Sequence, residues 1–145
     1  MDSILQSLDI LLVDDHQKFI DSIKLLLQTN QGIDHIYEAI NGKAALDIIK
    51  EKKIDMVITD FNMPEMTGIE LTRIIKAKYP YIKIIVLTMN ESIGIIREII
   101  NSEAEGYILK NTGKLELDKA INEIAAGGKY YSNEIHRKPL VTGHK

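Results

Sequence analysis

Short apolar runs in this sequence are followed directly by polar side chains that can bind a metal ion or a phosphoryl group. These side chains are Asp14 and Asp15 after the first run, Asp60, Thr88 and Lys110. Carboxylates bind hard cations and can attack phosphorus, whereas a lysine ammonium and a threonine hydroxyl bind phosphoryl oxygens. Taken singly, each has an ordinary explanation as a helix cap, a turn residue or a solvated lysine. Only their placement together indicates a site.

The segments that position these residues alternate between two periodicities. Short β-rich runs are followed by amphipathic segments of helical length, which predicts parallel βαβ units. The predicted strands are 10–13, 35–39, 56–59, 84–87 and 106–109. Five strands that alternate with five helices predict a doubly wound α/β sandwich of three layers.

The order of the strands follows in part from their hydrophobicity. The runs at 10–13, 56–59 and 84–87 are continuously apolar, as strands covered on both faces must be. The run at 35–39 is mixed, which is typical of an edge. The flavodoxin-like order 2-1-3-4-5 satisfies both observations, although the pattern alone leaves other orders open.

In that order the polar side chains share one rim of the sheet. Ligands of such sheets bind outside the carboxyl ends of the strands, where the order reverses between strands one and three. Three carboxylates at this rim would repel one another without a cation. Since all candidate ligands are hard oxygens, we expect Mg²⁺, with Mn²⁺ as a substitute, rather than Ca²⁺ or a thiolate-bound metal.

Composition excludes several other classes of protein. The net charge of −3 gives no electrostatic case for nucleic acid or an anionic membrane. The 145 residues include no cysteine, which excludes disulfides and thiol nucleophiles. No apolar run approaches the ~20 residues that span a bilayer, and the start Met1-Asp2-Ser3 lacks the basic region of a secretory signal. We therefore expect one domain in the cytoplasm.

The set of polar residues resembles the receiver domain of two-component response regulators over about residues 8–128. The resemblance rests on Asp14-Asp15, Asp60, Thr88 and Lys110, each after its strand. The loop with Met63-Pro64 and Gly68 is also similar. The run 106–110 (GYILK) and the later Ala125-Ala126-Gly127 are most similar to the NarL/FixJ subfamily, whose members usually carry a C-terminal helix-turn-helix.

The resemblance implies a role for each of these residues. Asp60 accepts a phosphoryl group from a sensor histidine kinase, in a self-modifying signalling domain rather than a turnover enzyme. Asp15, Asp60 and the backbone carbonyl of Asn62 bind Mg²⁺ directly, and Asp14 binds it mainly through water. Lys110 and the Thr88 hydroxyl bind phosphoryl oxygens.

The resemblance also implies a conformational switch. In the family, the threonine moves toward the phosphoryl group and an aromatic residue of strand five turns inward behind it. Thr88 and Tyr107 hold these positions, although Tyr107 can also be read as an ordinary edge-strand tyrosine. The isoleucine-rich stripe at 93–100 and the family habit together suggest a phosphorylation-dependent homodimer near helices four and five.

Two residues depart from the usual pattern of the family. Asn111 follows Lys110 where many receivers have proline, which leaves the isomer of that peptide bond open. Met89 follows Thr88 where many relatives have a smaller residue, and we expect it to restrict access to Asp60.

The domain organisation that we expect is a receiver at 1–128 and a C-terminal tail or start of a linker at 129–145. The tail is basic, with Lys129, Arg137, Lys138 and Lys145 around Pro139, and is too short for a helix-turn-helix. This segment is therefore expected to bind no nucleic acid, and DNA binding is left to an output domain beyond it. The alternatives are a stand-alone receiver or phosphorelay shuttle, a Mg²⁺-dependent phosphohydrolase, and a scaffold that is not phosphorylated.

Overall fold

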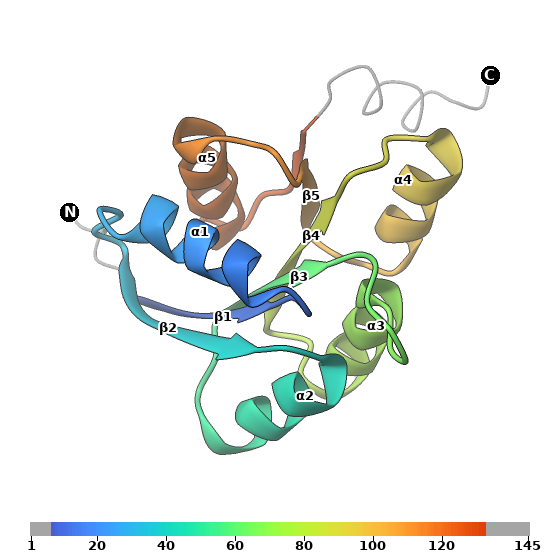
Figure 1. The fold of residues 1–145 in the computed structure, drawn as a ribbon, viewed down its shortest axis with the longest axis horizontal. Helices are drawn as coiled ribbons and strands as arrows, with labels where there is room; N and C mark the ends of the chain where they lie inside the picture. Colours follow the sequence, from blue (N-terminus) through green and yellow to red (C-terminus); the bar gives the residue numbers. More distant parts are fainter. Residues whose placement is uncertain (1–6, 133–145) are drawn as a thin grey trace.

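Parallel strands and helices alternate along the part of the chain that the structure describes, residues 7–132 of a computed structural model (Figure 1). The elements are β1 (Leu8–Val13), α1 (Gln17–Leu27), β2 (Ile33–Ala39), α2 (Gly42–Glu51), β3 (Met56–Asp60), α3 (Gly68–Lys78), β4 (Lys83–Thr88), α4 (Ile93–Asn101), β5 (Gly106–Leu109), α5 (Lys114–Ala125) and β6 (Tyr130–Tyr131).

The sheet has the order β2-β1-β3-β4-β5-β6, and every neighbouring pair is parallel. The predicted order of the first five strands is therefore confirmed, with β2 at an edge and β1 beside β3. The structure adds a sixth short strand, β6, to the five that we predicted, and this strand lies in the segment 129–145 that we predicted as a C-terminal tail or start of a linker. Its two residues follow a pair of glycines and are too few to show an alternation. The remaining tail residues on which that expectation rests, Arg137 to Lys145, lie outside the described residues.

Two apolar cores lie on opposite faces of the sheet, because successive strand residues point to opposite sides. In β1, Leu11 and Val13 pack with the helices α2, α3 and α4. Ile10 and Leu12 pack with α1 and α5 on the other face. Since helices cover both faces, the central strands are buried along their length, which explains their continuous hydrophobicity.

Several helix ends are fixed by caps, proline or glycine. The Asn41 side chain caps α2 by accepting a hydrogen bond from the N–H of Ala44. Thr67 and Glu70 form a reciprocal capping box that starts α3, and α3 ends at Lys78, before Pro80. After α5, Gly127 adopts a positive φ of 101°, which glycine adopts readily.

None of the helices in residues 7–132 is long and apolar enough to span a bilayer. The described peptide bonds are all trans, and that includes Lys110–Asn111.

Candidate phosphoryl and metal site

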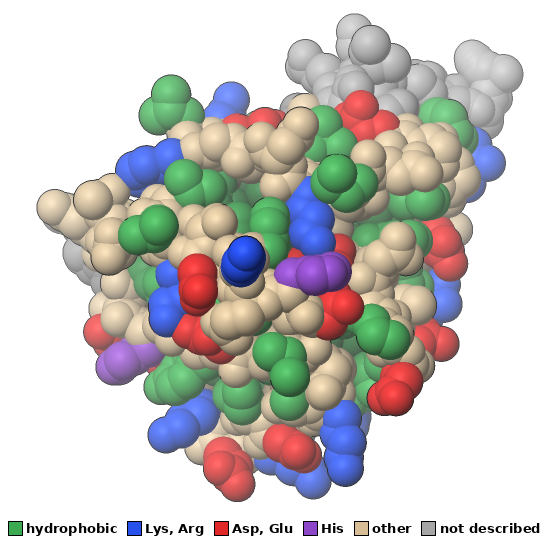
Figure 2. All heavy atoms as spheres, viewed as in Figure 1, with side chains coloured by type: hydrophobic (Ala, Val, Ile, Leu, Met, Phe, Trp, Pro, Cys, Tyr) green, Lys and Arg blue, Asp and Glu red, His purple; other side chains and the backbone are tan. Residues whose placement is uncertain are grey.

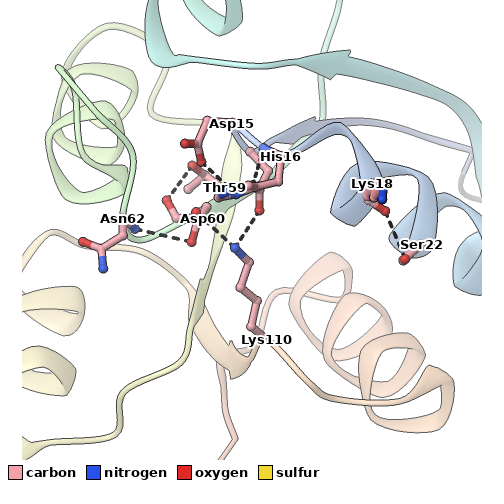
Figure 3. A network of polar contacts seen from close by, with 9 residues as sticks. Asp15, His16, Lys18, Ser22, Thr59, Asp60, Asn62 and Lys110 are labelled. Atoms are coloured by element: carbon pink, nitrogen blue, oxygen red, sulfur yellow. Dashed lines mark hydrogen bonds and ion pairs between the residues drawn. The ribbon is translucent and has the colours of Figure 1, made fainter.

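The carboxyl ends of four strands deliver the predicted polar residues to one rim. Backbone hydrogen bonds fix the positions of Asp14, Thr88 and Lys110. The N–H of Asp14 donates to the carbonyl of Ala39 at 3.1 Å, and the N–H of Lys110 donates to the carbonyl of Thr88 at 2.9 Å. Asp60 ends β3, next to β1 and β4. Acidic, basic and histidine side chains gather near the middle of the face in Figure 2, and Figure 3 shows Lys110 extended toward Asp60.

Lys110 bridges two buried carboxylates. Its Nζ lies 3.0 Å from Asp14 Oδ2 and 3.2 Å from Asp60 Oδ2, and the two aspartate side chains are only 3% and 5% exposed. The ammonium also lies 4.6 Å from the centroid of the Phe19 ring, a distance at which the ring attracts a cation. The Lys110 ammonium is thus held beside the carboxylate oxygen of Asp60.

Burial and charge shift the pKa values of this pair of groups. Burial raises the pKa of Asp60, and the negative charge of Asp14 raises it further, against Lys110 and the N–H of Asn62. Burial disfavours the ammonium of Lys110, but the attraction of Asp14 and Asp60 outweighs this effect and raises its pKa. Folding therefore disfavours the ionised form of Asp60, whereas it favours the charged form of Lys110.

Two of the acidic residues each have a side-chain oxygen that accepts no hydrogen bond from the described residues. Asp14 Oδ2 and Asp15 Oδ1 are buried and accept no hydrogen bond from the described residues. Lys110 Nζ lies 3.0 Å from the first and His16 Nδ1 lies 3.2 Å from the second. These contacts meet the distance of an ion pair but lack hydrogen-bond geometry. Buried carboxylate oxygens without donors suit a hard divalent cation, so the donor set fits Mg²⁺.

His16 also belongs to this cluster, although we predicted no role for it from the sequence. One ligand atom each from Asp14, Asp15, His16 and Asp60 lies within 4.8 Å of the others. His16 is the N-cap of α1, yet its side chain makes no capping hydrogen bond. Its Nδ1 instead lies 3.2 Å from Asp14 Oδ1, and its backbone N–H donates to the same oxygen at 2.9 Å. The available signal was its position directly after the aspartate pair.

Thr88 is the last residue of β4, and Tyr107 lies within β5. The Thr88 hydroxyl donates to the carbonyl of Asn90 and accepts from the N–H of Asn90, both at 3.0 Å. It is thus engaged by its own loop rather than by Asp60. Tyr107 is completely buried, and β6 lies outside β5, so it is not an edge-strand tyrosine.

Of the remaining predicted residues, Asn62 contacts Asp60 and Met89 lines a hollow beside Lys110. The N–H of Asn62 donates to Asp60 Oδ1 at 3.3 Å. Met89 is 77% exposed and lines a hollow of about 150 Å³ together with Thr88, Glu91, Leu109, Lys110 and Asn111.

The sequence matches the response regulator receiver domain family over residues 10–122. The chain belongs to this family. The sequence match and the fold agree, since the isolated receiver domain of RcsB from Salmonella enterica, determined with the phosphomimetic BeF3−, superposes with a TM-score of 0.83. That comparison has 27% identity and covers 91% of this chain and 98% of the other. A LuxR-family response regulator from Aurantimonas gives a TM-score of 0.85 at 28% identity, over 94% and 97% of the two chains.

Curated relatives of this receiver domain are named as regulators. The transcriptional regulatory protein YdfI of Bacillus subtilis is 41% identical over 71% of this chain and 48% of its own length. The response regulator GacA of Pseudomonas aeruginosa is 32% identical over 87% of this chain and 59% of its own. The receiver thus spans about half to three fifths of these relatives. Their names give no support to a phosphohydrolase, a stand-alone receiver or a phosphorelay shuttle.

Proposed function

We propose that this receiver domain accepts a phosphoryl group on Asp60 from a sensor histidine kinase and thereby controls an output, which is transcription. The observation that carries the proposal is Lys110 Nζ at 3.2 Å from Asp60 Oδ2 inside a buried acidic cluster. An ammonium at this place stabilises negative charge on a transferring phosphoryl group. The transcriptional output is supported by the names of relatives such as YdfI.

The transfer is a displacement at phosphorus. A carboxylate oxygen of Asp60 attacks the phosphorus of the donor's phosphohistidine, and the new O–P bond forms as the P–N bond breaks. The electron pair of the broken bond leaves with the donor's imidazole nitrogen. Lys110 exchanges its contact with Asp60 for a phosphoryl oxygen, and the Thr88 hydroxyl turns from Asn90 to another.

A divalent cation belongs to the same proposal. Asp15, Asp60 and the backbone carbonyl of Asn62 would hold Mg²⁺ directly, and Asp14 would hold it through water. The bound cation cancels charge on the equatorial phosphoryl oxygens, and Mn²⁺ can take its place. The buried oxygens of Asp14 and Asp15 that accept no hydrogen bond support this assignment.

The wider setting follows from the same proposal. We place the receiver at 1–128, with the start of a linker to a DNA-binding output domain after it. We place it in the cytoplasm, where a histidine kinase supplies the phosphohistidine donor. A phosphorylation-dependent homodimer near α4 and α5 completes the proposed partners.

The test is the Mg²⁺ dependence of a covalent adduct, measured by intact mass after incubation with acetyl phosphate. Wild type should gain one phosphoryl group with Mg²⁺ and none with EDTA, Asp60→Asn should gain none, and Asp15→Asn should need far more Mg²⁺. If wild type gains none, Met89→Ala and a phosphorylated histidine kinase are used as alternative routes to Asp60. No adduct by any route would overturn the proposal.

A further inference from the structure

The carboxylate of Glu116 connects three parts of the chain. Its Oε1 accepts the hydroxyl of Thr112 at 2.6 Å. Its Oε2 accepts the hydroxyl of Tyr130 at 2.9 Å and that of Ser132 at 3.0 Å. Burial disfavours the ionised form of Glu116, but the three donors outweigh it and lower the pKa of this carboxyl. Glu116 is therefore a charged acceptor that joins α5, the β5–α5 loop and the segment after α5.

The segment 130–132 lies along β5, the strand that carries Tyr107. The N–H of Tyr130 donates to the carbonyl of Glu105, and the N–H of Ser132 donates to that of Tyr107, both at 3.1 Å. The approach requires a glycine in β5, because a Cβ at Gly106 would lie 2.2 Å from the carbonyl oxygen of Tyr130.

The side chains of β6 extend this contact to both cores. Tyr131 packs against the core that contains Tyr107, and their ring centroids are 5.9 Å apart. Tyr130 packs into the core under α1 and α5. The segment is thus anchored on both faces of the sheet, and one of its anchors is the buried tyrosine of the switch.

The other end of the connection reaches the site through the β5–α5 loop. Thr112 stands two residues after Lys110, and its N–H donates to the carbonyl of Leu109 at 3.0 Å. Lys110 in turn contacts Asp14 and Asp60. A displacement of Lys110 therefore acts within two residues on the hydroxyl that Glu116 accepts.

We propose that Glu116 is a positioning residue that latches segment 130–132 against β5, and that phosphorylation of Asp60 releases this latch. The inference rests on the proposed function, because it needs a phosphoryl group at Asp60. It deepens that function by naming the element through which the site acts on the chain beyond Ser132.

The direction of the effect follows from the short bond of Thr112. At 2.6 Å, its hydroxyl is already at the short end of the range for O–H···O hydrogen bonds, which weaken steeply when stretched or bent. A phosphoryl group would add oxygens beyond the Asp60 carboxylate, and in this proposal Lys110 follows its new acceptor and draws its loop with it. Such a displacement should lengthen or bend the hydrogen bond from Thr112 to Glu116. The phosphorylated state and the closed latch therefore compete.

The first measurement is amide hydrogen exchange of Tyr130 and Ser132, with Mg²⁺ present and with or without beryllofluoride, whose binding is followed by ¹⁹F NMR. In wild type, beryllofluoride should speed exchange at these amides about tenfold or more, since a released strand loses its protection. In Glu116→Ala, exchange should be fast without beryllofluoride and change little with it. Glu123→Ala, an exposed glutamate of the same helix, serves as the control and should behave as wild type.

The second measurement uses the reciprocity of coupled equilibria. If phosphoryl binding opens the latch, a protein without the latch must bind beryllofluoride more tightly, by about fivefold or more. Damage to the fold alone would weaken binding instead. Should Glu116→Ala fail to fold, Glu116→Gln keeps one acceptor oxygen and should show a smaller gain of the same sign.

The outcomes separate the latch from the proposed function. Unchanged exchange at Tyr130 and Ser132 in wild type that has bound beryllofluoride would overturn the latch alone. Unchanged or weaker beryllofluoride affinity in both Glu116 variants would do the same. If neither wild type nor Met89→Ala binds beryllofluoride with Mg²⁺, and no donor phosphorylates Asp60, both proposals are overturned.

Discussion

At the scale of single residues, the site buries negatively charged carboxylates that would be better hydrated at the surface. Asp14 and Asp60 are 2% and 4% exposed, and one ammonium, that of Lys110, lies between them. Buried carboxylates that share one cation repel each other and lose hydration. The rim is therefore built for binding at some cost to the stability of the folded protein.

Asp60→Asn should stabilise the Mg²⁺-free protein at neutral pH, by on the order of 1 kcal/mol. The pKa of Asp60 is raised in the folded state, so its contribution to stability is present below the unfolded pKa and is lost as pH rises through the folded pKa. Urea unfolding of both proteins at several pH values measures this. Asp60→Asn should not show the loss of stability that wild type shows as pH rises through the folded pKa of Asp60. If Asp60→Asn is no more stable than wild type at neutral pH, the assignment is contradicted.

The sequence predicts some of these residues and not others, for physical reasons. Asp14, Asp60 and Lys110 could be found because a parallel sheet brings the carboxyl ends of its strands to one rim. The contact of His16 with the carboxylates depends on a side-chain rotamer at the start of α1, which no periodicity encodes. The bonds between Thr88 and Asn90 likewise depend on the conformation of a loop.

At the scale of elements, the start of α3 fixes the backbone around Asp60. The N–H of Gly68 donates to the carbonyl of Phe61 at 2.9 Å, and a Cβ at Gly68 would lie 2.2 Å from the carbonyl oxygen of Asp60. The reason for glycine here is this close approach, since Gly68 is not among the described residues with positive φ. The first turn of α3 thus packs directly on the strand end that bears the acceptor.

Gly68→Ala should lower the free energy of unfolding by about 1–3 kcal/mol, because the added methyl overlaps backbone that cannot move away freely. It should also slow phosphorylation of Asp60 by acetyl phosphate. Gly94→Ala is the matched control in the first turn of α4, where a Cβ meets nothing within 4 Å, and it should stabilise by up to about 1 kcal/mol. Thermal unfolding measures both, and equal effects of the two substitutions would contradict this account.

The elements differ in how well the sequence predicts them. The strands β1, β3 and β4 are recognisable because burial on both faces makes them continuously apolar. Strand β6 is not, since two tyrosines after Gly127-Gly128 carry no period and its pairing depends on the absence of a side chain at Gly106. In the isoleucine-rich stripe of α4, Ile96 and Ile99 are buried, whereas Ile93 is 40% exposed, so one edge of the stripe is open to solvent.

At the scale of the whole molecule, the receiver spans about half to three fifths of its relatives' length, and one structure of RcsB contains two dimers bound to two parallel DNAs. Two exposed apolar side chains support a dimer surface near α4 and α5. Ile93 is 40% exposed and Leu115 is 88% exposed. Single exposed apolar residues are common in monomers, so the surface is tested by its response to phosphorylation.

Sedimentation velocity with beryllofluoride and Mg²⁺ should show a dimer that is weaker or absent without beryllofluoride. Ile93→Ser should weaken the dimer about tenfold or more if its side chain is a contact in the centre of the interface. Leu25→Ser, an apolar residue of α1 that is 66% exposed, is the control and should leave the dimer unchanged. A monomer under both conditions would remove the dimer from the proposed function.

The most direct test of the central claim locates the phosphoryl group on the chain. Protein phosphorylated by acetyl phosphate with Mg²⁺ is reduced with borohydride, which converts an aspartyl phosphate to homoserine, and its peptides are analysed by mass spectrometry. If Asp60 carries the phosphoryl group, homoserine should appear at position 60, and none should appear there when Mg²⁺ is withheld. Homoserine at another aspartate, with Asp60 intact, would contradict it.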